Sequence, residues 1–86
     1  MNIQFHKSFE KRYKKLSLRL KLKIKERNEL FSSDPLNPVL NNHALKGKYA
    51  GYRSINVTGN IRIVYKLLNK NTALFSEIGS HSGLYK

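Results

Sequence analysis

The sequence lacks cysteine altogether and holds only five acidic residues. The absence of cysteine excludes a disulfide framework, a zinc ribbon and a thiol nucleophile. Four of the five carboxylates fall within the first 34 residues, and none forms the acidic pair that glycosidases or two-metal nucleases require. The chain also lacks a Walker loop, a Rossmann glycine pattern and an HExxH sequence. Histidine, arginine, lysine and tyrosine are therefore the residues left to carry any chemistry.

A long hydrophobic run is also missing. No apolar stretch approaches the roughly 20 residues that span a bilayer. The first fifteen residues are polar and basic and contain no apolar core of a secretory signal. With 86 residues, the chain is expected to form one small domain over residues 1–86. The simplest expectation is a cytoplasmic protein.

Positive charge dominates the composition. Seventeen Lys and Arg residues stand against five Asp and Glu residues, which gives a formal net charge of +12. A surface of this charge attracts polyanions. Nucleic acid is the first candidate partner, and an acidic membrane surface or an acidic protein comes next.

The start of the chain predicts a strand followed by a helix. Residues 2–5 alternate in polarity as a short strand does. Ser8 could cap a helix that runs to about Leu16, with Phe9, Tyr13 and Leu16 on one face.

The segment after Leu16 is ambiguous between strand and helix. Apolar and basic residues alternate from Leu18 to Lys25, which is the period of a strand. Leucine, lysine, arginine and glutamate are strong helix formers, however, and Ser17 is a suitable N-cap. A strand would also align like charges on one face, which neighbouring strands oppose. We therefore predict a helix over residues 17–32.

The second half of the chain predicts a sheet. Residues 34–50, with two prolines and three asparagines, suggest an irregular connection. Strand formers dominate residues 52–57, 61–68 and 72–78, with turn sequences at 58–60 and 69–71 between them. The prediction is an α+β fold of order β-α-α-β-β-β, with two N-terminal helices packed on one side of a small, mostly antiparallel sheet. Residues 80–86 follow the last predicted strand, so we expect the chain to fold without them.

The available residues suit metal-free cleavage of RNA. In that reaction a general base removes the 2′-hydroxyl proton, a general acid protonates the leaving 5′-oxygen, and cations hold the phosphate. His43 and His81 lie in polar segments, where they are either functional or simply exposed to solvent. Arg53 and Arg62 lie in predicted strands, where an arginine can equally face solvent. His6, where strand meets helix, is expected to be structural or solvent-facing.

Several segments of the second half together resemble one known family. They are His43-Ala44-Leu45-Lys46-Gly47, Gly51-Tyr52-Arg53-Ser54, Ile61-Arg62-Ile63-Val64-Tyr65-Lys66 and Ile78-Gly79-Ser80-His81-Ser82-Gly83-Leu84-Tyr85. In combination they are similar to the RelE/ParE superfamily of type II toxins, and most of all to its YafQ-like branch. The basic, helical first half fits the same family.

The resemblance implies a RelE-like fold and the activity of an mRNA interferase. Such a toxin is an endoribonuclease that cuts mRNA in the ribosomal A site, and here the chemistry would need no metal or other cofactor. The implied partners are a cognate acidic antitoxin, the ribosome and mRNA. We expect no membrane partner, and a toxin that is monomeric when free.

The resemblance also implies roles for individual residues. His43 and His81 match two catalytic histidines, Arg62 matches an arginine that contacts the scissile phosphate, and Tyr85 matches a terminal aromatic near the reacting nucleotide. We favour His43 as general base and His81 as general acid. Substrate contacts are expected from three further residues, Arg53, Lys46 and Asn60. The helix over residues 17–32 is expected to dock on ribosomal RNA phosphates through its basic residues Arg19, Lys21, Lys23 and Lys25.

Two positions depart from the YafQ-like pattern. Asn56 stands where these toxins tend to carry a further histidine, and Asn60 stands where they carry an aspartate. Asparagine cannot transfer protons at neutral pH, so both positions lose acid/base capacity. Two alternatives to an active nuclease therefore stay open. One is a non-catalytic gyrase inhibitor of the ParE kind, and the other is a decayed toxin that only binds antitoxin.

Overall fold

The computed structural model describes residues 1–84 of the chain. The elements, in chain order, are β1 (Asn2–Phe5), α1 (Lys7–Lys14), α2 (Leu18–Ser33), the 3-10 helix η1 (Pro38–Leu40), β2 (His43–Ala44), the 3-10 helix η2 (Gly47–Tyr49), β3 (Arg53–Asn56), β4 (Ile61–Asn69), β5 (Thr72–Ser80) and α3 (His81–Leu84). The predicted α+β order is confirmed, and β2, α3, η1 and η2 are added to it. No helix within residues 1–84 is long and apolar enough to cross a membrane.

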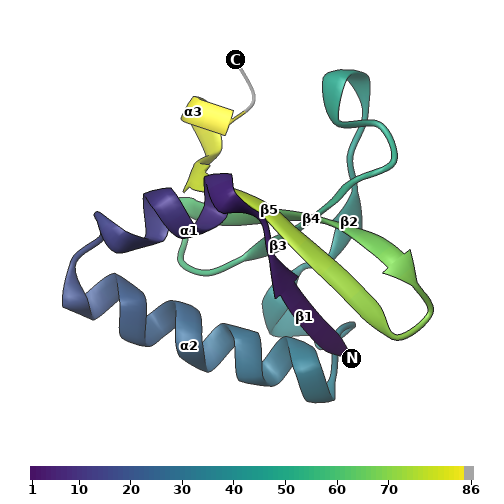
Figure 1. Ribbon diagram of the computed structural model, residues 1–86, viewed down its shortest axis with the longest axis horizontal. Helices are drawn as coiled ribbons and strands as arrows, with labels where there is room; N and C mark the ends of the chain where they lie inside the picture. Colours follow the sequence, from purple (N-terminus) through teal and green to yellow (C-terminus); the bar gives the residue numbers. More distant parts are fainter. Residues whose placement is uncertain (85–86) are drawn as a thin grey trace.

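The strands form one five-stranded sheet of order β1-β5-β4-β3-β2 (Figure 1). β3, β4 and β5 make the predicted antiparallel meander. β2 extends it by pairing antiparallel with β3, and β1 pairs parallel with β5 at the other edge. The sheet is therefore mixed but mostly antiparallel, as the sequence predicts.

Local capping determines where the two long helices begin. At α2, the Ser17 side chain accepts a hydrogen bond from the backbone N–H of Leu20 at 3.2 Å, so the predicted cap is confirmed. At α1, the predicted cap is wrong, because Ser8 lies inside the helix. His6 is the N-cap instead, and its Nδ1 accepts from the backbone N–H of Ser8 at 3.1 Å. His6 thus has the structural role expected of it.

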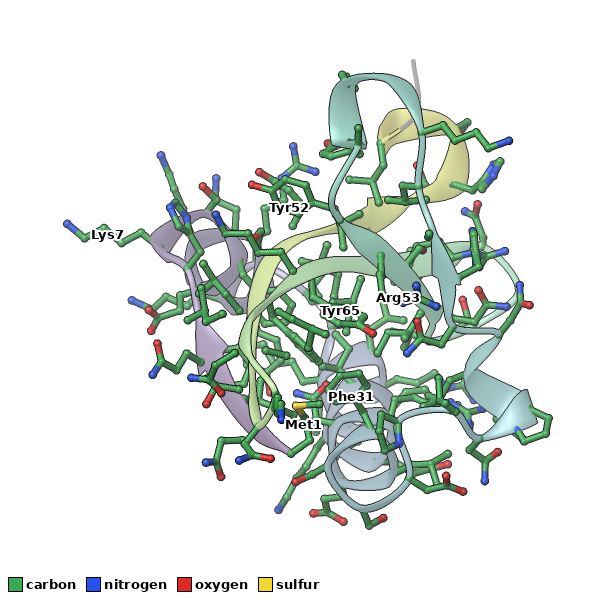
Figure 2. All side chains as sticks on the ribbon, turned by 90° about the vertical axis from the view of Figure 1, so that its right-hand side faces the viewer. Met1, Lys7, Phe31, Tyr52, Arg53 and Tyr65 are labelled. Carbon is green, nitrogen blue, oxygen red and sulfur yellow. The ribbon has the colours of Figure 1, made fainter. Side chains whose placement is uncertain are left out.

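Both N-terminal helices pack on the same face of the sheet. Phe9 of α1 and Phe31 of α2 are buried in one cluster with Tyr65 of β4 and Phe75 of β5. The ring centroid of Phe75 lies 5.2 Å from that of Phe31, 5.7 Å from Tyr65 and 6.0 Å from Phe9. Figure 2 shows Phe31 and Tyr65 between the sheet and α2. The hydrophobic core therefore fills one face of the sheet and leaves the other for different contacts.

The C-terminal segment belongs to the fold. Ser80 is the last residue of β5 and pairs with Ile61. Leu84 of α3 is only 4% exposed, and its side chain lies 3.4 Å from the position that a Cβ atom on Gly79 would occupy. Ser80 pairs in the sheet and Leu84 is buried against it, so the segment contributes more to the fold than the sequence predicts, and folding without residues 80–86 stays a prediction.

We expect Phe75→Ala to lower the free energy of unfolding by about 3–5 kcal/mol, because it removes buried apolar contacts and leaves a cavity. Urea denaturation followed by circular dichroism would measure the change. Leu68→Ala, at a side chain that is 46% exposed, is the matched control and should cost well under that amount. A loss of less than about 1 kcal/mol for Phe75→Ala would contradict its central place in the core.

Candidate nucleic-acid interface

The face of the sheet opposite α1 and α2, called the site face below, carries a row of residues from four strands. His43 of β2 is opposite Ser54 of β3, which is opposite Val64 of β4, which is opposite Glu77 of β5. Residues that are directly opposite in an antiparallel pair point to the same face. Val64 lies between two core residues of β4, so this row points away from the core.

A second row runs beside the first on the site face. Asn56 of β3 is opposite Arg62 of β4, which is opposite Gly79 of β5. Gly79 has no side chain, and Leu84 of α3 and the guanidinium of Arg12 occupy the space above it. Figure 1 shows α3 and the β2–β3 connection rising on this side of the sheet, while α2 lies on the other. The site face is therefore flanked by two short segments that lie over its ends.

At the β3–β4 turn, the structure brings Arg62, Asn60 and His81 together. Arg62 is half-buried, and its Nη1 donates to the backbone carbonyls of Thr58 at 2.8 Å and Ile61 at 3.3 Å. The backbone N–H of His81 donates to the carbonyl of Asn60 at 2.9 Å, which fixes the first residue of α3 against the turn. Within residues 1–84, Nε and Nη2 of Arg62 have no partner, so both can donate to a phosphate.

His43 is held in one tautomer by its neighbour. Its Nδ1 lies 2.8 Å from the carbonyl oxygen of Asn41. A carbonyl only accepts, so Nδ1 must carry the hydrogen, and in the neutral ring Nε2 keeps the lone pair. Asn41 has a φ of 45°, a left-handed conformation that asparagine tolerates better than most residues. Asn41 is thus a residue that the sequence analysis missed, and its carbonyl orients the exposed imidazole of His43.

Arg53 lies on the helix-side face, apart from His43. It is opposite Tyr65, a core residue, and Figure 2 shows the two side by side. The Nε of Arg53 donates to Oδ1 of Asn42 at 2.8 Å, and Nδ2 of Asn42 donates to the hydroxyl of Tyr65 at 2.7 Å. Arg53 thus ties the connection before β2 to the sheet, and its contact with the substrate stays a prediction.

Of the three remaining predicted site residues, the structure describes two. Lys46 is exposed and directly precedes η2, in the connection that rises on the site-face side (Figure 1). Asn60 is exposed at the turn beside Arg62. Tyr85 lies outside the described residues.

The four basic residues of α2 that are expected to dock on RNA do not lie on one side of the helix. Lys21 and Lys25 lie on the flank that faces α1. Arg19 and Lys23 line a different hollow, which also includes Thr58 of the β3–β4 turn. Because an α-helix has 3.6 residues per turn, side chains at alternate positions cannot share one line along it. The four residues therefore lie on two flanks of α2, and only the Arg19 and Lys23 flank adjoins the turn that holds Arg62.

The helix side of the molecule contains an apolar hollow. An apolar hollow of about 640 Å³ lies between β1, α1 and α2, lined by Phe5, Phe9, Glu10 and Glu29 among others. Two carboxylates, Glu10 and Glu29, and two ammonium groups, Lys14 and Lys25, line this hollow, so its charges balance, unlike those of the chain as a whole. Within residues 1–84, no three His, Cys, Asp or Glu side chains lie close enough together to hold a metal ion.

Comparison with known proteins identifies the family that shares this arrangement. Residues 1–86 match the family described as the bacterial toxin of type II toxin-antitoxin system, YafQ. The chain belongs to the YafQ toxin family. This YafQ-family chain is accordingly a type II toxin, as its resemblance to the RelE/ParE superfamily predicts.

Solved structures of toxins share the fold over nearly the whole chain. YafQ from E. coli is 26% identical to this YafQ-family chain, with a TM-score of 0.81 over 99% of this chain and 98% of that one. A chain of the DinJ-YafQ toxin-antitoxin complex from E. coli is 27% identical, with a TM-score of 0.79 over 99% of this chain and 97% of that one. A copper-bound mutant toxin from Helicobacter pylori is 27% identical, with a TM-score of 0.73 over 99% of each chain. A search of curated protein sequences found no match.

We expect nuclear magnetic resonance to find opposite tautomers for two histidines of this YafQ-family toxin. The Nδ1 of His43 donates to a carbonyl, whereas the Nδ1 of His6 accepts a backbone N–H. Long-range ¹⁵N–¹H spectra at alkaline pH should therefore show Nδ1–H for His43 and Nε2–H for His6, and each ring serves as the control for the other. An Nε2–H tautomer at His43 would contradict the proposed orientation of its ring.

Proposed function

We propose that this YafQ-family toxin is an endoribonuclease that cuts mRNA in the ribosomal A site. The observation that carries the proposal is the placement of His43, Arg62 and His81 on or beside one face of the sheet. That face belongs to a chain with a net charge of +12, which favours binding of a nucleic acid. The family, whose members are toxins, supports a destructive activity of this kind.

The chemistry that these residues could perform is phosphodiester transfer without a metal. Nε2 of His43 accepts the 2′-hydroxyl proton, and the 2′-oxygen forms a bond to phosphorus. Nε and Nη2 of Arg62 hold the phosphate oxygens as charge develops on them. The bond from phosphorus to the 5′-oxygen breaks, and protonated His81 gives its proton to that oxygen. The products carry a 2′,3′-cyclic phosphate and a 5′-hydroxyl. Lys46, Asn60 and Tyr85 stay as predicted contacts to the RNA.

The partner that silences the toxin is proposed to be an acidic antitoxin. The structure of the DinJ-YafQ complex from E. coli supports such a partner, because that relative is bound to its antitoxin. Charge complementarity to the +12 toxin supports its acidic character. We propose that the free toxin is monomeric and that it acts in the cytoplasm, where translating ribosomes are found.

The proposed activity is tested by toeprinting on mRNA that is being translated in the presence of the purified toxin. We expect cuts at the A-site codon. Arg62→Ala should slow single-turnover cleavage about 10²–10³-fold, and Arg62→Lys should restore only part, because an ammonium lacks the planar fork of a guanidinium. His81→Ala should slow cleavage about 10²–10⁴-fold.

Lys70→Ala is the control for these variants, because Lys70 is exposed at the β4–β5 turn. It should cleave at the wild-type rate. Intact mRNA together with stalled replication would instead indicate a gyrase inhibitor. If Arg62→Ala and His81→Ala both cleave at the wild-type rate, neither residue takes part in the reaction and the proposed active site is wrong.

We further propose that Arg19 and Lys23 dock on ribosomal RNA phosphates, since their flank adjoins the β3–β4 turn. The double variant Arg19→Gln/Lys23→Gln should weaken ribosome binding and reduce its salt dependence by about one unit of slope per lost contact. Lys21→Gln/Lys25→Gln removes the same charge from the other flank and should have a smaller effect. Equal effects of the two pairs would show that only net charge matters, and the proposed direction of docking would be abandoned.

A further inference from the structure

A hollow of about 300 Å³ adjoins the site face, and the proposed chemistry leaves it unused. Lys48, Tyr49, Tyr52, Lys66 and Glu77 are among the residues that line it. Tyr52 precedes Ser54 by two residues, and Lys66 follows Val64 by two. Two residues along a strand span about 6.6 Å, so Tyr52 and Lys66 lie one short step along their strands from Ser54 and Val64. Glu77 is the end of that row farthest from His43. Figure 2 shows Tyr52 on the far side of the sheet from Phe31.

A β-bulge turns Glu77 toward this hollow. Tyr65 is opposite Phe75, but Val64 is opposite Glu77, so Ser76 is the extra residue between the two pairs. Without the bulge, Phe75 and Glu77 would point to the same face. With it, Phe75 enters the core and Glu77 joins the site face. Bulges that re-aim a side chain are over-represented next to functional sites.

Among residues 1–84, Glu77 is a carboxylate without a partner in a strongly basic chain. It is the only acidic residue after Asp34, and it is half-buried. In the part of the chain that the structure describes, residues 1–84, its oxygens make no hydrogen bond and no ion pair. The two lysines of the hollow lie over tyrosine rings instead, Lys48 at 5.3 Å from Tyr49 and Lys66 at 5.6 Å from Tyr52. A partly desolvated carboxylate without donors favours a ligand that brings N–H groups.

The rest of the hollow suits a nucleobase. The rings of Tyr49 and Tyr52 lie 6.0 Å apart at 75°, and such rings provide faces on which RNA bases stack. The ammonium groups of Lys48 and Lys66 supply positive charge for the phosphates on either side of a stacked base. A phosphate itself is disfavoured beside Glu77, because the two negative charges would repel. The base edge, not the backbone, must therefore face the carboxylate.

We propose that this hollow binds a guanine base of the RNA next to the scissile phosphate. The base stacks on Tyr52, and the carboxylate of Glu77 accepts hydrogen bonds from its N1–H and N2–H groups. Guanine is the base that presents two adjacent donors on its Watson–Crick edge, which matches the two oxygens of a carboxylate. Adenine and cytosine each offer a single amino group there, and uracil offers one N–H between two carbonyls. This proposal rests on the proposed nuclease function and gives it a base preference.

The first test measures binding without cleavage. Guanosine 5′-monophosphate titrated into ¹⁵N-labelled toxin should shift the amide signals of Tyr52, Lys66 and Glu77, whereas adenosine, cytidine and uridine monophosphates should bind roughly tenfold more weakly. Inosine 5′-monophosphate, which lacks the N2 amino group, should also bind more weakly than the guanine nucleotide. Glu77→Gln should remove this preference, because an amide offers only one acceptor. Glu29→Gln removes a charge from α2, away from the hollow, and should retain the preference.

The second test measures cleavage on translated mRNAs that vary one base at a time around the cut. Wild-type toxin should prefer guanine at one position, and Glu77→Gln should reduce that preference about tenfold. Binding of guanine nucleotide by a toxin that cuts no mRNA would support the hollow and reject the nuclease function. Cleavage without any effect of Glu77→Gln, together with equal binding of all four nucleotides, would overturn the guanine site and leave the nuclease function standing.

Discussion

The packing of Phe75 against four other aromatic rings is the interaction on which the rest of this structure depends. Its partners are Phe5 of β1, Phe9 of α1, Phe31 of α2 and Tyr65 of β4. One side chain of β5 therefore joins both helices and both neighbouring strands to the sheet. In a chain without disulfides, the burial of aromatic surface at this point must supply much of the stability. Because the helices occupy this face of the sheet, His43, Arg62 and Glu77 lie on the opposite face, around the buried Ser54 and Val64.

Backbone carbonyls accept hydrogen bonds from the candidate site residues. The carbonyl of Asn41 holds the ring of His43, those of Thr58 and Ile61 hold Arg62, and that of Asn60 accepts from the backbone of His81. A carbonyl dipole fixes a donor without neutralising its charge. The cations of the site thus keep their attraction for a polyanion while their geometry is set. This arrangement explains how a protein with so few acidic residues can still position its basic ones.

The bulge at Ser76 connects the core to the proposed base preference. It places Phe75 in the core and Glu77 on the site face, although the two residues are separated by a single position. A regular strand could satisfy only one of these placements. The chain therefore gains one negative group on a positive surface, beside the tyrosines on which a base can stack. Attraction for RNA in general and selection of one base would then come from different residues of the same face.

Local signals in the sequence were sufficient for much of the fold. The Ser17 cap and the strong helix formers after it define α2, and the β-branched and aromatic runs between polar turns define β3, β4 and β5. The resemblance of the second half to known toxins predicted the family, which the comparison confirmed. His43, Arg62 and His81 were predicted as site residues in this way, because each lies in a segment that carries the resemblance, and their roles stay predictions.

The tertiary structure decided which side chains share a face. Arg53 and Arg62 look equivalent in the sequence, yet their positions in the register place Arg53 beside Tyr65 and Arg62 opposite Gly79. In the sequence, Glu77 is the one acidic residue of the second half and no position for it is predicted. The bulge places it on the site face, whereas regular alternation along β5 would have placed it on the core face with Phe75. Register and bulges arise from pairing between strands distant in sequence, so no local pattern reveals them. The sequence alone thus determined most of the elements and predicted the family, while the pairing of β3, β4 and β5 decided which candidate residues share a face.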